Sequence, residues 1–147
     1  VPQSIKKIHN LGIIPHLTEY DFFKERYGDK YYVINLKNSN IENVIMEITS
    51  CEAVVSTSLH GIIVAHAYGI PAIWIRVGDI NHAGDFKFHD YFSSVNIDFY
   101  RGFENYDEII EDEVVRNELL KSNIALPNID MPNLRQSLLN AFPFALL

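Results

Sequence analysis

The chain has 147 residues, and its 19 acidic side chains outnumber its 12 Lys and Arg side chains, for a formal net charge of -7. This length suits one domain around one hydrophobic core, and 48% hydrophobic residues are enough to fill that core. The negative charge argues against sequence-independent binding to nucleic acid or to an anionic membrane surface, because Lys and Arg must neutralise the phosphates there. A small anionic ligand is not excluded, since a few donors at a helix start can hold one.

The sequence also bears on the cellular compartment of the protein and on whether the chain is part of a longer one. Cys51 is the single cysteine, so an intrachain disulfide cannot form, and no run approaches the roughly 20 apolar residues of a membrane span. We therefore expect a cytoplasmic protein. The chain begins Val-Pro-Gln-Ser, without Met or a signal pattern. We interpret residues 1–147 as a single Rossmann-like domain cut from a longer chain, with an N-terminal domain absent.

The first elements in chain order are two strands around a short helix. Residues 11–17 (LGIIPHL) form a short apolar run that ends in Pro-His, which is typical of a buried strand meeting a loop. Residues 20–26 are compatible with a short helix. Residues 31–36 (YYVINL) have the β-branched and aromatic content of a second strand.

Two capped helices and two more strands follow. Residues 38–40 (NSN) supply a helix start, and the helix after them has apolar positions spaced by three or four between Ile41 and Ile48. A buried strand is predicted at 53–55 and another at 72–75 (AIWI). Between them, residues 59–68 form an apolar helix that Ser or Thr caps and Gly69 ends.

Strands that alternate with helices of about ten residues are the pattern of βαβ units. Residues 11–75 therefore predict a doubly wound, mostly parallel sheet with helices on both faces, in the α/β class. Beyond it we expect a polar loop at 78–85, an aromatic block at 86–92, an acidic helix at 106–120 and a last helix at 132–142.

The topology directs attention to residues 56–61 (STSLHG), because ligands of open α/β sheets bind outside the carboxyl ends of the strands. The hydroxyls can cap the helix, and Gly61 allows a ligand or another chain close to the backbone. His60 would lie beside the positive end of the helix dipole, which favours a neutral ring unless an anion is bound. The alternative is a histidine that caps or packs at a buried helix start.

Other chemistries have weaker support in the sequence. A nucleophilic serine is not expected, because there is no Gly-x-Ser-x-Gly motif, and Cys51 suits a small buried hydrophobic residue. No pair of the six histidines has a recognised metal-ligand spacing, so no metal is predicted. In the aromatic block, Lys87, His89 and Asp90 alternate with aromatic residues, which an amphipathic turn with its charges in water would also explain.

Three ordered segments resemble one family. Residues 56–65 followed by 67–71 (AYGIP) look like the signature block of the polysaccharide pyruvyl transferases. Residues 12–16 (GIIPH) and 86–94 (FKFHDYFSS) are similar to other blocks of that family, in the same order. The resemblance extends over roughly residues 11–94, and the remainder of the chain adds little to it.

The resemblance implies an enzyme of two lobes, akin to the GT-B glycosyltransferases, of which this chain is the carboxy-terminal half. Such enzymes move the enolpyruvyl unit of phosphoenolpyruvate to a sugar, form a pyruvyl ketal across two hydroxyls and release phosphate. The implied partners are phosphoenolpyruvate as donor substrate, a glycan or lipid-linked sugar as acceptor, and the chain's own N-terminal domain, with no cofactor. A lipid-linked acceptor would bring the enzyme to the inner face of the membrane. The fragment alone would be inactive.

The resemblance also assigns residues. The family's histidine in this block maps onto His60, which would contact the donor or transfer a proton. Many members have an arginine directly before Leu-His-Gly, where this sequence has Ser58. The predicted substrate-binding residues are Ser58, Leu59, Gly61, Lys87 and His89, converging with His60 on one anion-binding crevice in which Lys87 replaces the missing arginine. Two alternatives stay open: a GT-B glycosyltransferase that uses a nucleotide sugar, and a ligand-binding domain of the same fold without catalysis.

Overall fold

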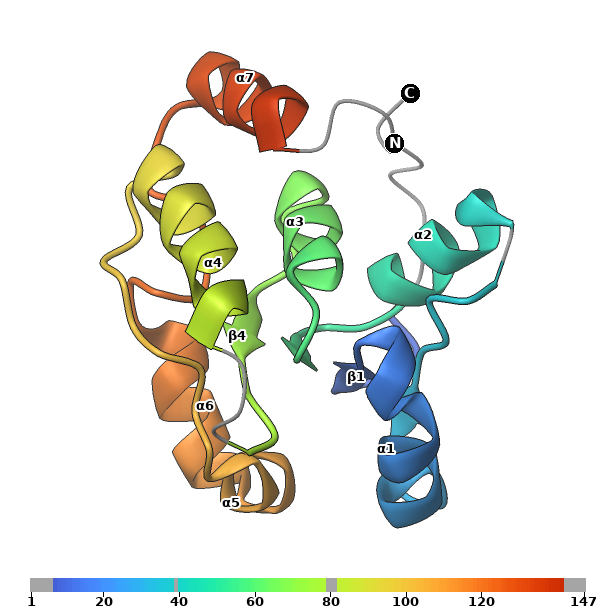
Figure 1. Ribbon diagram of the computed structural model, residues 1–147. Helices are drawn as coiled ribbons and strands as arrows, with labels where there is room; N and C mark the ends of the chain where they lie inside the picture. Colours follow the sequence, from blue (N-terminus) through green and yellow to red (C-terminus); the bar gives the residue numbers. More distant parts are fainter. Residues whose placement is uncertain (1–6, 39, 79–81, 142–147) are drawn as a thin grey trace.

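A computed structural model describes residues 7–38, 40–78 and 82–141 of the chain (Figure 1). Its described residues contain one sheet of four parallel strands in the order β2-β1-β3-β4. The strands are β1 (Gly12–Ile14), β2 (Tyr32–Val33), β3 (Val54–Ser56) and β4 (Ala72–Trp74). The predicted parallel, Rossmann-like sheet is therefore confirmed. β1, β2 and β4 are shorter than the predicted runs, and β3 is shifted by one residue from the predicted 53–55.

Helices follow each strand and cover both faces of the sheet. They are η1 (Leu17–Glu19), α1 (Tyr20–Tyr27), α2 (Ile41–Thr49), α3 (Leu59–Ala67), α4 (His82–Ser94), α5 (Tyr106–Glu111), α6 (Glu113–Lys121) and α7 (Met131–Ala141). Figure 1 shows α2, α3, α4 and α7 on one side of the strands and α1, α5 and α6 on the other. None of the helices in the described ranges is long and apolar enough to span a lipid bilayer.

Each strand contributes side chains alternately to two hydrophobic cores, as the period of two requires. The core under α2, α3, α4 and α7 contains Ile14, Val54 and Trp74. The core under α1, α5 and α6 contains Ile13, Val55 and Ile73. Burial on both faces explains why the strand sequences are continuously apolar rather than alternating.

Several helix starts occur where the sequence predicted them, and the starts of α4 and α6 do not. Asn40 caps α2 and Ser58 caps α3, each by accepting a hydrogen bond from the backbone N–H three residues on. The single acidic helix predicted at 106–120 is wrong. Asp112 has extended backbone angles and ends α5, and its carboxylate caps α6 by accepting from the N–H groups of Val114 and Val115. An Asp in mid-helix competes for the backbone in this way.

The aromatic block is helical rather than a turn. It lies within α4, which also includes residues 82–85 of the predicted loop, while residues 79–81 lie outside the described residues. Phe88 is buried and stacks on Trp74 with ring centroids 3.8 Å apart. Lys87 and His89 remain exposed, so the block is amphipathic as expected, but with a helical period.

The strand order has a reversal that locates the ligand-binding edge. From β1 the chain moves outward to β2 and then crosses back to β3, which pairs with the other side of β1. A crevice opens where successive connections diverge in this way, outside the carboxyl ends of the strands. The loops after β1 and β3 must therefore border that crevice.

Candidate functional site

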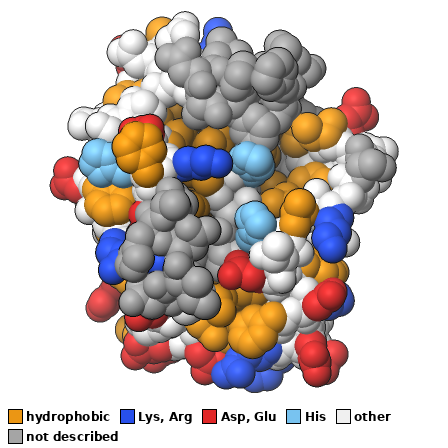
Figure 2. Space-filling model, viewed as in Figure 1, with side chains coloured by type: hydrophobic (Ala, Val, Ile, Leu, Met, Phe, Trp, Pro, Cys, Tyr) orange, Lys and Arg blue, Asp and Glu red, His pale blue; other side chains and the backbone are white. Residues whose placement is uncertain are grey.

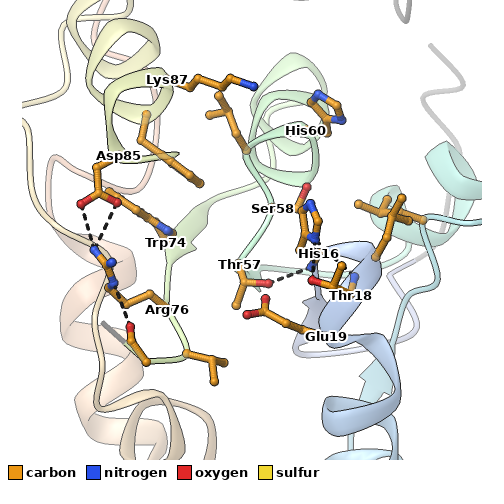
Figure 3. Close-up of a pocket in the computed structure, with 16 residues that line it drawn as sticks. His16, Thr18, Glu19, Thr57, Ser58, His60, Trp74, Arg76, Asp85 and Lys87 are labelled. Carbon is orange, nitrogen blue, oxygen red and sulfur yellow. Dashed lines mark hydrogen bonds and ion pairs between the residues drawn. The ribbon is translucent and has the colours of Figure 1, made fainter. Parts of the chain in front are cut away.

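A cleft of about 590 Å³ opens at this edge of the sheet. Figure 2 shows the face, with two His side chains, a basic and an acidic side chain gathered around a hollow. The cleft is lined from the loop after β1, the β3–α3 turn and the segments around β4 and the start of α4, together with Leu36. The lining residues drawn and labelled in Figure 3 are His16, Thr18, Glu19, Thr57, Ser58, His60, Trp74, Arg76, Asp85 and Lys87.

Two hydroxyls join the loops that meet at the strand reversal. The Ser56 Oγ donates to the carbonyl oxygen of Ile14 at 2.7 Å and is fully buried. The Thr57 N–H donates to the same carbonyl at 3.2 Å, and the Thr57 Oγ1 accepts from the backbone N–H of His16 at 2.8 Å. Ser56 and Thr57 therefore hold together the two loops that border the cleft.

Ser58 and Gly61 form the frame of the helix start. Ser58 is 5% exposed, and its hydroxyl accepts from the Gly61 N–H at 3.5 Å. Gly61 faces the sheet, where an added Cβ would lie 2.7 Å from Cγ2 of Ile14 and 2.8 Å from Oγ of Ser56. The sequence predicted that Gly61 allows a ligand or another chain close to the backbone, whereas the close approach in the structure is to β1 and β3 of the same chain. Leu59 and Ser58 line the cleft, and Gly61 is not among the lining residues.

His60 is in the first turn of α3, exposed, and lines the cleft. The alternative of a histidine packed into a buried helix start is therefore wrong. The pKa of His60 is lowered from its ordinary value, first by partial removal from water, then by the positive charge of Lys87 and by His16. These effects favour the neutral ring, and a bound anion would oppose them.

Lys87 comes from α4 and reaches the same cleft. Figure 3 shows its side chain extending from α4 toward the first turn of α3, which carries His60. The two residues are close enough for the charge of Lys87 to lower the pKa of His60. His89 is placed differently: it lines a separate polar hollow with Ser93, Asn96 and Asp98, and its ring packs edge-on against Phe99.

Several residues of the cleft were not predicted from the sequence. His16, Thr18 and Glu19 come from η1 and the residue before it, Arg76 comes from the segment after β4, and Asp85 comes from α4. Arg76 directly follows the strand predicted at 72–75, and a charged residue at the carboxyl end of a predicted parallel strand was the available signal. Glu19 and Asp85 had no comparable signal, because their positions depend on how η1 and α4 fold back.

Arg76 and Asp85 form a buried ion pair at the edge of the cleft. The Arg76 Nη1 donates to both carboxylate oxygens of Asp85, at 3.2 and 3.0 Å, and the side chains are 9% and 18% exposed. Arg101 approaches the same carboxylate at 3.3 Å. Figure 3 shows the Arg76 guanidinium directed to Asp85 and the segment after β4. The pair thus ties the start of α4, and with it Lys87, to the end of β4.

A sequence model of the polysaccharide pyruvyl transferase family matches residues 3–79, just over half of the 147 residues. The chain belongs to this family. The match includes the β1 loop and the β3–α3 turn that border the cleft, and it ends before α4. Lys87 therefore lies outside the matched residues, and the fold brings it to the cleft beside the β3–α3 turn, which the match includes.

A relative in Acanthamoeba polyphaga mimivirus, the uncharacterized protein L143, is 38% identical over 96 residues. The aligned residues make up 62% of the present chain and 33% of L143, so the chain spans about a third of that relative's length. No solved structure matches the chain.

This family member has two further kinds of reactive side chain, a thiol and the side chains that could bind a metal. Cys51 is buried, and burial raises the pKa of its thiol to about 11, so it behaves as the small hydrophobic residue expected. Within residues 7–38, 40–78 and 82–141, no cluster of three or more His, Cys, Asp or Glu residues is arranged to hold a metal ion.

Proposed function

We propose that this chain provides the donor side of a transferase that moves the enolpyruvyl unit of phosphoenolpyruvate to a sugar of a polysaccharide or its precursor. The observation that carries the proposal is the convergence of His60 and Lys87, from two separate segments, on one cleft at the start of α3. The domain would be the carboxy-terminal half of a two-lobed, GT-B-like enzyme, completed by its own N-terminal domain.

The cleft has the chemistry that an anionic donor requires. Phosphoenolpyruvate carries a phosphate and a carboxylate, and the N-terminus of α3 presents backbone N–H groups and the positive end of the helix dipole. Lys87 adds a full positive charge at the same place. Because Ser58 is buried as the cap, Lys87 supplies the cation that an arginine before Leu-His-Gly would otherwise bring.

The proposed reaction assigns His60 the role of general acid. A bound dianion raises the pKa of His60, so the ring becomes a proton donor when the donor substrate is present. It protonates the methylene carbon of the enol, which creates an oxocarbenium-like centre at the neighbouring carbon. One sugar hydroxyl bonds to that carbon and returns its proton to His60. The carbon–oxygen bond to phosphate then breaks, a second hydroxyl of the same sugar bonds to the carbon, and its proton leaves with the phosphate. Lys87 and the helix N–H groups stabilise the departing phosphate.

The decisive experiment is donor turnover by the full-length protein and its His60→Ala variant. We expect the substitution to lower kcat/KM for phosphoenolpyruvate by about 10²–10⁴-fold, the range for losing a general acid. His89→Ala is the matched control, an exposed histidine on α4 outside the cleft, and should change turnover by less than about threefold. Equal activity in His60→Ala and the wild type would refute the role of His60.

Donor competition separates the proposal from its alternatives. Phosphoenolpyruvate should displace inorganic phosphate from the cleft, and nucleotide sugars should displace it far less. A stronger displacement by a nucleotide sugar would identify a glycosyltransferase instead. Binding of phosphoenolpyruvate without turnover in the full-length protein would identify a ligand-binding domain. Residues 1–147 alone should bind the donor weakly without turning it over, because a crevice of this kind is closed by two lobes.

A further inference from the structure

The two sides of the cleft differ in charge. On one side, α3 and α4 contribute the helix N-terminus and Lys87, whereas the other side consists of η1 with the residue before it and carries the carboxylate of Glu19. Figure 3 shows Glu19 below Thr57, with its carboxylate pointing into the space between the two sides. Glu19 is half-buried, and its carboxylate has no hydrogen-bond or ion-pair partner among the residues that the structure describes.

The backbone fixes Glu19 in this position. Its N–H donates to the carbonyl oxygen of His16 at 2.9 Å. The His16 N–H is in turn held by Thr57 at 2.8 Å, at the strand reversal. The Nδ1 of His16 accepts from the Thr18 N–H at 3.2 Å, which places the proton of a neutral imidazole on Nε2. Three consecutive hydrogen bonds therefore position η1 on the sheet.

An unpaired carboxylate in an anion-binding cleft requires an explanation. A carboxylate beside the phosphate or carboxylate of the donor would repel it, so Glu19 does not belong to the same subsite as Lys87. Its preferred ligand is a group that donates hydrogen bonds without negative charge. The other cleft residue that is a carboxylate, Asp85, is already paired with Arg76, so Glu19 alone among the described lining residues presents an available carboxylate.

We propose that Glu19, with the Thr18 hydroxyl beside it, forms the subsite that holds a hydroxyl pair of the acceptor sugar. This inference rests on the proposed function, and it assigns part of the acceptor site to the present domain rather than wholly to the other lobe. The carboxylate accepts a hydrogen bond from one sugar hydroxyl. The Thr18 hydroxyl donates its proton to the Nδ1 of His16 at 2.9 Å, so its oxygen can accept a hydrogen bond from a neighbouring hydroxyl on the same ring.

The test measures binding of neutral sugars to the full-length protein, using methyl α- and β-pyranosides of glucose, galactose and mannose in the presence of saturating inorganic phosphate. We expect at least one pyranoside to bind the wild type, and Glu19→Gln to weaken that binding by about tenfold, since a hydrogen bond to a charged group is lost. Glu25→Gln, an exposed residue on α1 that does not line the cleft, is the matched control and should leave sugar binding unchanged.

Phosphate binding distinguishes this inference from the proposed function. Glu19→Gln should bind phosphate as tightly as the wild type or slightly more tightly, because a negative charge is removed from the cleft. Failure of all six pyranosides to bind, or equal sugar affinity in Glu19→Gln and the wild type, overturns the acceptor subsite and leaves the donor site intact. Lys87→Gln tests the donor site independently of the sugar result. Weaker phosphate binding in this variant supports the donor site, and unchanged phosphate binding refutes the proposed function.

Discussion

Partial removal from water and nearby positive charge both lower the pKa of the His60 imidazole. The pKa of His60 is lowered first by partial burial and then by Lys87 and His16. Lys87→Gln removes one of these causes, so the pKa of His60 should rise while remaining below its ordinary value, because partial burial is the larger cause. An NMR titration of the His60 ring in the two proteins measures this. Lys24→Gln on α1 is the control, and an unchanged pKa in Lys87→Gln would contradict the placement of its ammonium group.

Bound phosphate should shift the pKa of the His60 ring in the opposite direction, upward. A bound phosphate dianion favours the imidazolium, so saturating inorganic phosphate should raise the pKa of His60, and Lys87→Gln should weaken the affinity for phosphate. The ring signals of His89 give an internal reference in the same spectra, because this exposed residue lies outside the cleft. If phosphate changed the chemical shifts of the His60 and His89 rings equally at a fixed pH, binding would be nonspecific.

At the scale of elements, Gly61 determines how closely α3 packs on the sheet. An added Cβ would meet Cγ2 of Ile14 at 2.7 Å and Oγ of Ser56 at 2.8 Å, closer than side-chain atoms pack. Gly61→Ala should therefore destabilise the fold by about 1–3 kcal/mol, as overpacking does. Helix propensity alone would give the opposite sign, a stabilisation of up to about 1 kcal/mol. Urea unfolding measures whether the free energy of unfolding falls or rises in Gly61→Ala. A stabilised variant would show that α3 can move away from β1.

The Arg76–Asp85 pair connects α4 to β4 and is largely out of water. Asp85→Ala leaves a guanidinium that is 9% exposed without this carboxylate. Breaking a buried pair on one side costs about 3 kcal/mol or more, and the residual exposure of Asp85 places the expected loss at the lower end. Lys30→Met is the comparison, because the Lys30–Glu111 pair is 3.5 Å long with side chains 70% and 37% exposed. That change should cost under about 1 kcal/mol in the same unfolding experiment.

At the scale of the whole molecule, the buried His66 makes stability depend on pH. It is 1% exposed, and its ring lies between the Tyr91 hydroxyl at 2.8 Å and the carbonyl oxygen of Ala125 at 3.0 Å. The carbonyl requires a donor, so the neutral ring carries its proton on Nε2 and accepts from Tyr91 at Nδ1. Burial lowers the pKa of His66 to about 4.

The sign of the pH dependence follows from this shift. Between pH 6.5 and about 4 the unfolded chain binds a proton at His66 and the folded chain does not. The contribution of His66 is thus complete above pH 6.5 and is lost as the pH falls, by roughly 3 kcal/mol across that window. Urea unfolding between pH 4 and 7 should show a smaller decrease in His66→Leu than in the wild type. Equal slopes would show that His66 becomes protonated within the fold.

Local patterns in the sequence determined the elements of this molecule. Apolar runs and caps such as Asn40 and Ser58 act within a few residues, so the strands and most helix starts could be predicted, and the placement of His60 in the first turn of α3 followed from the cap. The family could be identified for the same reason, since its signature is a contiguous segment. The predicted helix at 106–120 failed because Asp112 supports either a helix interior or a cap.

Only the tertiary structure decided which side chains share the cleft. The strand order places the loop after β1 beside the β3–α3 turn, and this brings His16 and Glu19 opposite His60, although Glu19 and His60 are 41 positions apart in the sequence. The helical period of α4 sends Lys87 to the cleft and His89 to another surface, two residues apart in sequence. Strand order and helix phase depend on packing energies summed over the whole core, so no local pattern specifies them.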